Sequence, residues 1–366
     1  MRLSLALVAL TVAVLPLSAR ADDLFANLVR QHILSLLPAS APGGIAVAVR
    51  LDGRTQFFST GPVDADSLFN IASLRKPFEA TLLARAVGDG RMSLDDPIAK
   101  YLPEISPGSD IARVTMGQLA THTSGLLLPQ DHPPWPTERY TLDTFFAALN
   151  AWRADANQAP GRQHIYTHAG YILLQLVLER ALGGPIDALV SRQLLGPLGL
   201  ESSLIPQRGA DGRGLLPPPL LQRAVQGYGE DGAPVGLPGN QQTYYDFPGT
   251  GQMFSTARDL LTFIDANMGD GPNHGPVDPS LVQAMQLAQR PAFPTGTRTS
   301  QGLAWEIDDT HAPRLIDKNG GLNNASAYMG MMPARRLGIV VLCSHGGVDV
   351  AQAARHVIRR YTEQHS

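Results

Sequence analysis

Lysine is scarce in this sequence of 366 residues. Only three of its 29 basic residues are lysine, namely Lys76, Lys100 and Lys318, and the other 26 are arginine. A desolvated lysine can lose its proton, whereas arginine stays charged under ordinary conditions. A bias toward arginine that left a few lysines by chance explains Lys100, but Lys76 and Lys318 have chemically suggestive neighbours and are candidates for function.

Cysteine is scarcer still, since Cys343 is the single one in the chain. It cannot form an internal disulfide, so an exported form of the chain must be held together by packing alone. The apolar run at residues 337–342 directly precedes it, which predicts a buried structural thiol rather than a nucleophile.

Basic tracts, Gly-rich phosphate loops, internal repeats and low-complexity segments are all missing from the sequence. The formal net charge is −3, and a mildly acidic chain without a basic cluster is a poor partner for nucleic acids or anionic membranes. No pattern in the sequence specifies an oligomeric state.

Residues 1–21 have the pattern of a secretory signal peptide. Arg2 supplies the positive charge, residues 3–17 are apolar, and Ala19-Arg20-Ala21 has the small-x-small form of a cleavage site. The apolar segment is short for a membrane span. We therefore expect cleavage after Ala21, a periplasmic protein, and no membrane span in the mature chain.

The remaining residues predict an α/β (α+β) fold whose sheet comes from both ends of the chain. A helical pattern covers residues 24–37, and two strand patterns flank Asp52-Gly53, a pair typical of hairpin turns. Further strand patterns precede a closing helix at 350–361 and cover residues 302–307, 314–318, 325–332 and 337–343. Short links between them predict a mainly antiparallel sheet flanked by the terminal helices.

The middle of the chain is predicted to be mainly helical. Helical patterns cover residues 116–122, 142–152, 171–182 and 256–265, and residues 209–219 predict a surface loop. We expect residues 22–366 to form one catalytic domain of two lobes. The α/β lobe comprises about 22–75 plus 266–366, and an inserted all-helical lobe comprises about 76–265.

Ser73 and Lys76 form a Ser-x-x-Lys arrangement at the start of a predicted helix. This spacing places both side chains on one helical face. A serine hydroxyl becomes a good nucleophile when a neighbouring group takes its proton, and Lys76 lies within one turn. A serine at a helix start also directs its own backbone N–H toward the group that it attacks.

Three further stretches follow in chain order. They are Thr121-His122-Thr123-Ser124-Gly125, Tyr166-Thr167-His168 before a helix, and Asp317-Lys318-Asn319-Gly320-Gly321 after a strand. With these stretches, and with residues 95–103, 302–306 and 337–342, the chain resembles the serine β-lactamase and penicillin-binding protein family, most closely the class C β-lactamases. The likeness covers nearly the whole mature chain, while the Ser-Asp-Asn motif of class A is absent.

For catalysis, the resemblance implies that Ser73 is the nucleophile, Lys76 its hydrogen-bonded partner and Tyr166 the proton shuttle. Acyl transfer needs a nucleophile, a proton acceptor and donors for the developing oxyanion. A tyrosine ordinarily ionises far above neutral pH, but two nearby ammonium groups favour its anion. The ordinary alternative for Tyr166 is a tyrosine that only packs at a helix start, and for Lys318 it is a solvated charge at the end of a strand. Their occurrence together with the Ser73-x-x-Lys76 motif, in the right chain order, argues against both alternatives.

For substrate binding, the resemblance implies Lys318 and Asn319 as contacts of the substrate carboxylate and Gln130 as a further contact. The N–H of Gly321 would join that of Ser73 in an oxyanion hole. Asn319 stands where the family has threonine, and it still donates and accepts hydrogen bonds.

His168 stands where the family has asparagine. A neutral imidazole offers one donor and one acceptor in a different shape, so substrates with an acylamino side chain should be penalised and carbapenems least. A second interpretation makes His168 a zinc ligand together with His122, His132 or His164. We favour the hydrogen-bonding interpretation, because these histidines match no strong zinc spacing and no acidic ligand is evident nearby.

The leading hypothesis is an exported serine hydrolase that opens β-lactams, including carbapenems, through an acyl-enzyme and without an obligatory cofactor. The first alternative is a D-alanyl-D-alanine carboxypeptidase or esterase of the same fold, acting on a peptidoglycan peptide or an ester. The second alternative is a non-catalytic penicillin-recognising protein, with His168 and Asn319 as signs of decay. The intact Ser73, Lys76, Tyr166 and Lys318 argue against the second.

Overall fold

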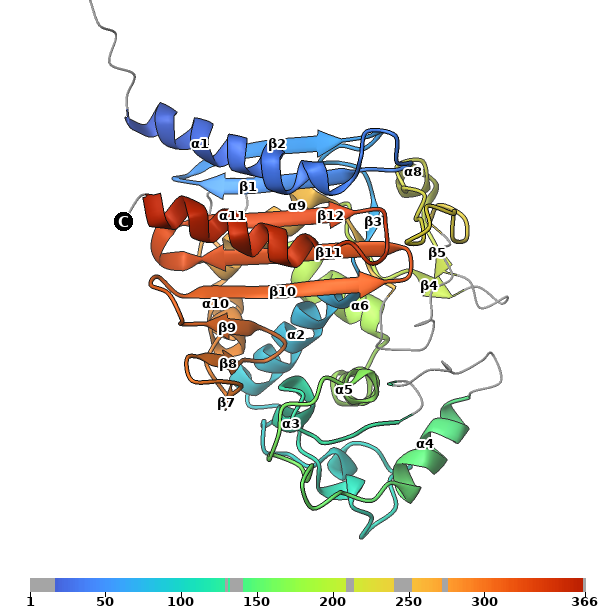
Figure 1. Ribbon diagram of the computed structural model, residues 1–366. Helices are drawn as coiled ribbons and strands as arrows, with labels where there is room; N and C mark the ends of the chain where they lie inside the picture. Colours follow the sequence, from blue (N-terminus) through green and yellow to red (C-terminus); the bar gives the residue numbers. More distant parts are fainter. Residues whose placement is uncertain are drawn as a thin grey trace, which may run out of the picture.

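An antiparallel sheet of eight strands is built from both ends of the chain (Figure 1). The computed structural model describes residues 17–128, 131, 141–208, 214–239, 252–271 and 276–364. The strand order across the sheet is β2-β1-β12-β11-β10-β9-β8-β7. These strands are β1 (Ile45–Leu51), β2 (Arg54–Thr60), β7 (Phe293–Pro294), β8 (Thr299–Gln301), β9 (Glu306–Asp308), β10 (Leu315–Leu322), β11 (Ala325–Met332) and β12 (Leu337–Cys343).

The predicted hairpin at Asp52-Gly53 is confirmed. Strands β1 and β2 pair in register from Ile45↔Thr60 to Leu51↔Arg54. Asp52 and Gly53 both have positive φ values, 49° and 78°, which two-residue hairpin turns of the favoured twist require. The hairpin then joins the C-terminal strands through the pairing of β1 with β12.

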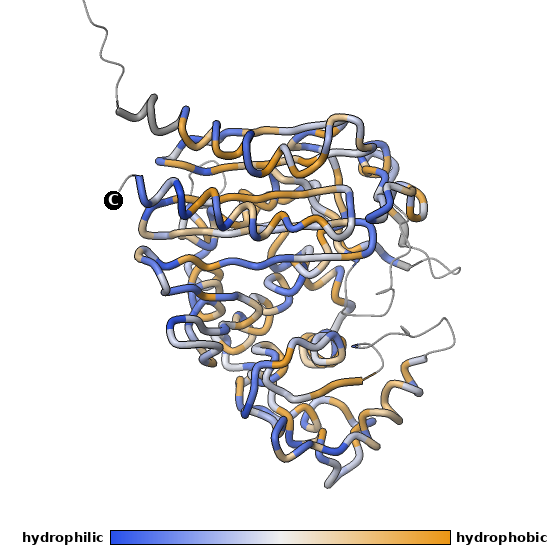
Figure 2. The backbone as a smooth tube through the Cα atoms, in the orientation of Figure 1, coloured by the Kyte–Doolittle hydropathy of each residue, from blue (hydrophilic) through white to orange (hydrophobic). Residues whose placement is uncertain are grey.

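Both faces of the sheet are covered, because alternate residues of a strand point to opposite sides. Val47 and Val341 belong to one hydrophobic core with α1 (Leu17–His32) and α11 (Val350–Gln364). Ala48 and Val340 belong to the other core, where α9 (Ala257–Asn267) packs against β1 and β12. Figure 2 shows β12 as a hydrophobic run, as expected for a strand that is buried on both faces.

The helices of the middle of the chain do not share one side of the sheet, since in the view of Figure 1 α3 (Met116–Ala120) and α4 (Leu142–Ala151) lie below it and α8 (Pro218–Leu221) lies at its upper right. The central one is α2 (Lys76–Gly88), which packs against α5 (His168–Leu182) and α10 (Pro279–Ala288). The others are α3 (Met116–Ala120), α4 (Leu142–Ala151), α6 (Ile186–Val190), a π-helical turn (Ser191–Leu195), α7 (Gly196–Leu198) and α8 (Pro218–Leu221). Two short ladders also occur, β3 (Phe69–Asn70) with β6 (Phe254–Ser255) and β4 (Gln207–Arg208) with β5 (Gly214–Leu215).

The prediction of a strand at residues 302–307 is wrong for most of these residues, since β9 begins only at Glu306. Residues 302–305 turn between β8 and β9, and Ala304 has a φ of 65°, outside the extended region. The N–H groups of Leu303 and Ala304 donate to the carbonyls of Ala288 and Ala120. Hydrogen bonds to two helix ends therefore replace the ladder that the local pattern predicts.

Other element boundaries also differ from the prediction. The strand predicted at 314–318 continues to Leu322, because β11 pairs with it as far as Leu322↔Ala325. The α-helix predicted at 24–37 ends at His32 and is followed by a 3-10 turn, Leu34–Leu36. Helix α10 and strands β7 and β8 were not predicted from the sequence.

Cys343 is buried in β12, as predicted, and burial raises the pKa of its thiol to about 12. Among the described residues, no helix is both long and apolar enough to cross a membrane. Residues 209–213 of the predicted surface loop lie outside the described part of the chain.

Candidate active site

Ser73 lies on a single 3-10 turn, Ala72–Arg75, directly before α2. The α-helix therefore begins at Lys76 and not at the serine. Side chains three residues apart eclipse one another in a 3-10 turn. The Ser-x-x-Lys spacing accordingly brings Lys76 Nζ to 3.2 Å from Ser73 Oγ, and both residues are buried.

The backbone around the serine is held in an uncommon conformation. Ala72 has a φ of 52°, in the left-handed region that costs a residue with a Cβ roughly 1–2 kcal/mol. Its N–H donates to Asn70 Oδ1 at 3.1 Å. Gly320 of β10 lies against this turn, since a Cβ there would be 3.0 Å from Ser73 N. The missing side chain of Gly320 lets the strand approach the backbone of the serine.

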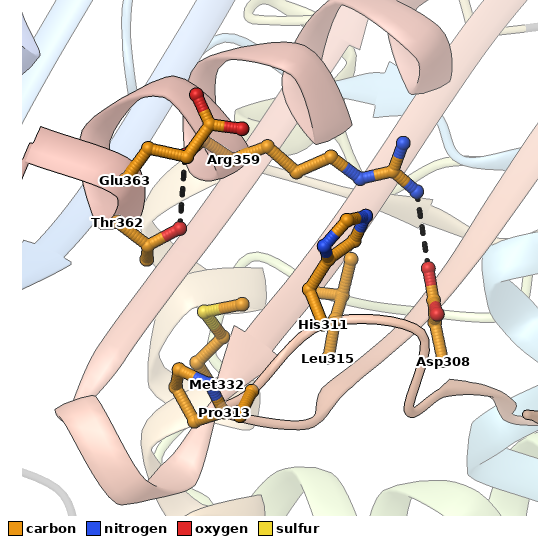
Figure 3. Close-up of a pocket in the computed structure, with 9 residues that line it drawn as sticks. Asp308, His311, Pro313, Leu315, Met332, Arg359, Thr362 and Glu363 are labelled. Atoms are coloured by element: carbon orange, nitrogen blue, oxygen red, sulfur yellow. Dashed lines mark hydrogen bonds and ion pairs between the residues drawn. The ribbon is translucent and has the colours of Figure 1, made fainter. Parts of the chain in front are cut away.

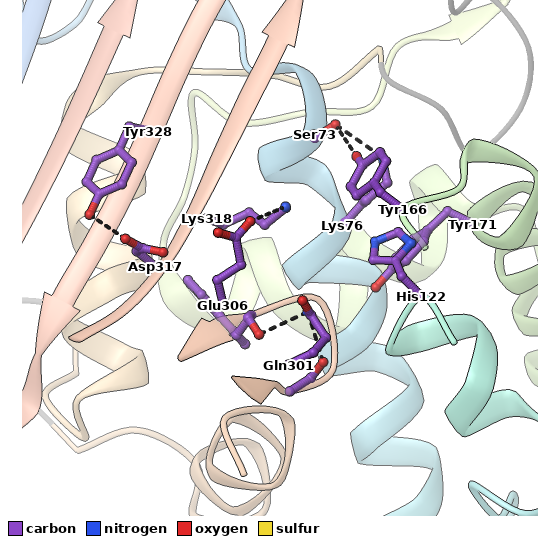
Figure 4. Close-up of polar contacts among 12 residues, drawn as sticks. Ser73, Lys76, His122, Tyr166, Tyr171, Gln301, Glu306, Asp317, Lys318 and Tyr328 are labelled. Carbon is purple, nitrogen blue, oxygen red and sulfur yellow. Dashed lines mark hydrogen bonds and ion pairs between the residues drawn. The ribbon is translucent and has the colours of Figure 1, made fainter. Parts of the chain in front are cut away.

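Tyr166 comes from the segment that leads into α5, which Thr167 caps by accepting the Gly170 N–H. The hydroxyl of Tyr166 lies 2.7 Å from Ser73 Oγ. The ammonium nitrogens of Lys76 and Lys318 lie 5.2 Å and 5.1 Å from the centroid of its ring. Figure 4 shows Ser73, Lys76 and Tyr166 as one cluster at the start of α2.

The two ammonium groups control the protonation of Tyr166. Burial raises the pKa of its hydroxyl, but the charges of Lys76 and Lys318 and the hydrogen bonds from Lys76 and Ser73 outweigh burial, so the pKa lies below its ordinary value of 10. His122 stacks on the ring at 4.3 Å between centroids. Burial, followed by the two lysine charges, holds the pKa of His122 well below its ordinary value. The stacked imidazole is therefore neutral and adds no third positive charge.

Lys318 is paired with a carboxylate that the sequence reasoning did not assign to the site. Its Nζ lies 3.1 Å from Glu306 Oε1 (Figure 4). Arg355 of α11 holds the other oxygen of Glu306 at 2.8 Å. Burial lowers the pKa of Lys318, but Glu306 and Tyr166 outweigh burial and bring it above its ordinary value. Both members of the Lys318–Glu306 pair are therefore charged at neutral pH, since the two cations also lower the pKa of Glu306 against the effect of burial.

One cavity of about 250 Å³ brings most of the predicted site residues together. Its lining comprises Ser73, Tyr166, His168, Glu306, Lys318, Asn319, Gly320 and Gly321. A Cβ on Gly321 would meet nothing within 4 Å, so its backbone borders open space. Gln130 lies outside the described residues, and its contact with substrate stays a prediction.

His168 is the first residue of α5 and lines this cavity. Its backbone N–H donates to Asp131 Oδ1, and Asp131 also accepts from Thr167 Oγ1 at 3.2 Å and from Leu128 N at 3.0 Å. Burial, then the charges of Lys76 and Lys318, lower the pKa of His168 to about 3. A neutral imidazole with one donor and one acceptor therefore lines the cavity.

The zinc interpretation of these histidines finds little geometric support. Within the part of the chain that the structure describes, no group of three or more His, Cys, Asp or Glu side chains is placed to hold a metal. His122 and His164 form an edge-to-face pair with ring centroids 5.9 Å apart, and His122 lies under Tyr166. His132 lies outside the described residues.

Three residues of the site escaped the sequence reasoning. Glu306, Gly320 and Asp131 were not predicted as site residues, yet Glu306 and Gly320 line the cavity and Asp131 accepts the backbone N–H of His168. A carboxylate at 306 carries no local signal, because its function depends on β10 and α11 passing beside it. Gly320 does carry a weak signal, since adjacent glycines in a strand mark a close backbone approach.

A serine hydroxyl that shares hydrogen bonds with a lysine and a tyrosine is the nucleophile arrangement of hydrolases that work through an acyl-enzyme. The family model described as Beta-lactamase matches residues 26–362. The chain therefore belongs to the beta-lactamase family and is a serine hydrolase.

Individual relatives agree with this assignment. A beta-lactamase from Lysobacter lactamgenus is 29% identical over 342 residues, which cover 82% of this chain and 81% of that protein. A solved class C beta-lactamase matches with a TM-score of 0.75 at 25% identity, covering 93% of this chain and 95% of that one. A D-alanine carboxypeptidase from Burkholderia cenocepacia matches with a TM-score of 0.73 at 26% identity, covering 94% and 99%. The predicted family and fold are confirmed.

Proposed function

We propose that the protein hydrolyses β-lactams through an acyl-enzyme on Ser73. The observation that carries the proposal is the shared hydrogen bonding of Ser73 Oγ, 2.7 Å from the Tyr166 hydroxyl and 3.2 Å from Lys76 Nζ, on the wall of a cavity of about 250 Å³. The names of the relatives supply the substrate class, and the geometry supplies the residues.

In acylation, the proton of Ser73 passes to the phenolate of Tyr166 while Oγ attacks the carbonyl carbon of the lactam. The N–H groups of Ser73 and Gly321 receive the developing oxyanion, and such donors contribute about 3–4 kcal/mol each in comparable enzymes. The C–N bond of the ring then breaks, and the nitrogen takes the proton from Tyr166. Lys76 keeps the phenolate stable throughout, because its ammonium group lies beside both oxygens.

Deacylation reverses these roles. A water molecule gives its proton to the Tyr166 phenolate and attacks the ester carbonyl, and Ser73 leaves with a proton returned from Tyr166. No cofactor takes part in this scheme. Turnover should therefore be unaffected by a chelator, and a chelator-dependent loss would bring back the zinc interpretation of His168.

Mass spectrometry after exposure to a β-lactam tests the proposal. An adduct is expected on the peptide that contains Ser73 and should be absent from Ser73→Ala. An adduct on another peptide, or undiminished turnover by the variant, would contradict the assignment of the nucleophile.

A D-alanyl-D-alanine carboxypeptidase activity is the second candidate, favoured by the likeness to the carboxypeptidase from Burkholderia cenocepacia. Acylation is common to both activities, and they differ in how fast water removes each acyl group. Turnover of a penicillin, a cephalosporin, a carbapenem and a D-alanyl-D-alanine peptide separates them. A stable adduct with every β-lactam and rapid release of D-alanine would favour the peptidase.

We also propose export to the periplasm, with cleavage after Ala21, and a role in antibiotic resistance. The charged, apolar and small-residue regions of residues 1–21 support the leader. N-terminal sequencing of the mature protein should begin at Asp22. Retention of the leader in a membrane fraction would count against export.

The division into an α/β lobe and a helical lobe remains part of the proposal. The strand order supports it, because β1 and β2 lie beside β12 and the intervening chain returns to the sheet. The packing of α9 on β1 and β12 favours grouping that helix with the sheet. The candidate site lies where α2, α5 and β10 meet.

A further inference from the structure

Tyr166 is the least enclosed member of the catalytic cluster. It is 36% exposed, whereas Ser73 and Lys76 are 8% and 1% exposed. It also lies two residues before α5 begins, outside the regular hydrogen bonds of that helix. Because a displacement of about 1 Å costs about 10²-fold in rate, the position of this hydroxyl needs support from another part of the chain.

His122 holds the backbone on both sides of Tyr166. Its carbonyl accepts the N–H of Ile165 at 2.8 Å, and its Nδ1 accepts the N–H of Thr167 at 3.3 Å. His122 itself is 1% exposed, and its own N–H donates to the carbonyl of Leu119 in α3 at 3.2 Å. The end of α3 is thereby tied to the two residues that flank the catalytic tyrosine.

The imidazole ring of His122 also supports the phenol ring directly. The two rings stack with centroids 4.3 Å apart and an interplanar angle of 29°. On α5, the ring centroid of Tyr171 lies 4.9 Å from that of the same imidazole, and the hydroxyl of Tyr171 donates to the carbonyl of Ala120 at 3.0 Å. Figure 4 shows His122 beside both tyrosines. The ring of Tyr166 therefore has a buried support that is fixed to both α3 and α5.

Two unfavourable features of His122 indicate that packing alone does not explain this residue. Its φ of 54° lies in the left-handed region, which is costly for a residue with a Cβ. Because Nδ1 accepts a hydrogen bond, the proton of the neutral ring is on Nε2. Within the part of the chain that the structure describes, Nε2 is buried without a hydrogen-bond partner, which most buried donors have. Exceptions of this kind cluster at functional sites.

We infer that His122 is a positioning residue that holds the hydroxyl of Tyr166 against Ser73 for proton transfer. The inference rests on the proposed acylation of Ser73 and names a further residue for the same step. The described lining of the cavity does not include His122, so this residue acts through Tyr166 and not by touching the substrate. Its substitution should therefore lower the rate of acylation and leave the affinity for the substrate unchanged.

Two variants remove different parts of this support. His122→Phe keeps an aromatic ring under Tyr166 and removes the Nδ1 acceptor. His122→Asn removes the ring, keeps an acceptor oxygen close to the position of Nδ1, and suits a positive φ. In stopped-flow measurements with a chromogenic cephalosporin, each variant should lower the acylation rate constant by about tenfold or more, with an unchanged Kd for the substrate.

The split between rate and affinity decides the outcome. An unchanged acylation rate in every folded variant would overturn the inference, and so would a loss that appears only in the Kd for the substrate. Asparagine fits the backbone at this position, so His122→Asn alone decides the question if His122→Phe does not fold.

A second comparison tests whether His122 acts through Tyr166. Tyr166→Phe removes the hydroxyl that His122 is inferred to position. In this background, His122→Asn should cause no further loss of the residual acylation, because the group that it positions is already missing. A merely structural role would produce the same fold-change with and without the hydroxyl, so an equal loss in both backgrounds would overturn the inference.

Two histidines outside the site serve as controls. The ring of His345 stacks on Tyr228 with centroids 5.1 Å apart, which is the same type of pair in another part of the fold. His311 lines a separate cavity of about 200 Å³ with Arg359 of α11 (Figure 3). His345→Asn and His311→Asn should leave the acylation rate unchanged. A tenfold loss in either control would assign the effect to a general weakening of the fold and would contradict a specific role for His122.

The two levels of the proposal fail in different ways. If the wild-type protein forms no adduct on Ser73, the proposed function fails, and the inference fails with it. If the wild-type protein acylates Ser73 and Tyr166→Phe slows that step, but neither His122 variant does, only the inference fails.

Discussion

The hydroxyl of Tyr166 lies 2.7 Å from Ser73 Oγ, although 93 positions separate the two residues in the chain. Packing of α5 against α2 makes this contact, and Lys76 at the start of α2 reaches the same serine oxygen. The three groups form one hydrogen-bonded cluster whose protons are shared.

Lys76 and Tyr166 should act as one proton-transfer unit. Lys76→Ala and Tyr166→Phe should each lower the acylation rate by about 10² to 10⁴, the usual range for a lost general acid or base. The double variant should be nearly as active as the worse single variant, because either loss disables the same step. Pre-steady-state acylation rates check this, and a double loss equal to the product of the single losses would show independent roles.

The pH profile should depend on Lys318. The phenolate of Tyr166 is the active base, so acylation rises with pH through the pKa of Tyr166, which Lys76 and Lys318 hold below 10. Lys318→Gln removes one of these charges and raises the pKa of Tyr166, so the rising limb of kcat/KM should move to higher pH. An uncharged ester substrate isolates this effect from carboxylate binding. A limb that stays in place would show that Lys318 does not influence the base.

Gly320 should tolerate no side chain. A Cβ at this position would lie 2.9 Å from Ile71 O and 3.0 Å from Ser73 N, both of which are backbone atoms. Gly320→Ala must therefore move β10 or the turn of the serine, and a displacement of 1 Å costs about 10²-fold in rate. Gly321→Ala is the control, since its Cβ meets open space and its N–H remains, so a much smaller loss is expected. Equal losses in kcat would argue against the close approach as the cause.

His168 should influence the choice among β-lactams. Asparagine at this position provides an amide for the acylamino side chain of cephalosporins, whereas carbapenems lack that group. His168→Asn should raise the ratio of cephalosporin to carbapenem turnover by about three- to tenfold, as expected for one hydrogen bond. Parallel kcat/KM measurements check the ratio, and an unchanged value would remove His168 from specificity.

The buried ion pair between Arg75 and Glu79, which follow Ser73 in the chain, should be important for the stability of the fold. Glu79 is fully buried, and its Oε1 lies 2.6 Å from Arg75 Nε. Glu79→Ala leaves the guanidinium group without this carboxylate and should lower the free energy of unfolding by about 3–5 kcal/mol. Arg113→Ala breaks an exposed pair with Asp110 and should cost less than about 1 kcal/mol. Urea unfolding compares the two, and similar costs would contradict the importance of burial.

Local patterns in the sequence were sufficient for features that depend on neighbouring residues. The Asp52-Gly53 turn was predictable because few residue pairs accept two positive φ values, and β12 because its apolar run suits a strand buried on both faces. The Ser73–Lys76 contact follows from a spacing of three residues within one turn. The order of these motifs along the chain was also enough to indicate the family.

Contacts between distant segments were decided by the tertiary structure alone. Glu306 meets Lys318 because β9 pairs with β10, and Arg355 reaches both Glu306 and Asp317 because α11 packs on the face of the sheet over β11 and β12. Residues 302–305 have a strand-like composition, yet they turn because Leu303 and Ala304 donate to Ala288 and Ala120. A local pattern encodes the period of an element, whereas its partners depend on how the assembled sheet and the packed helices bring remote groups together.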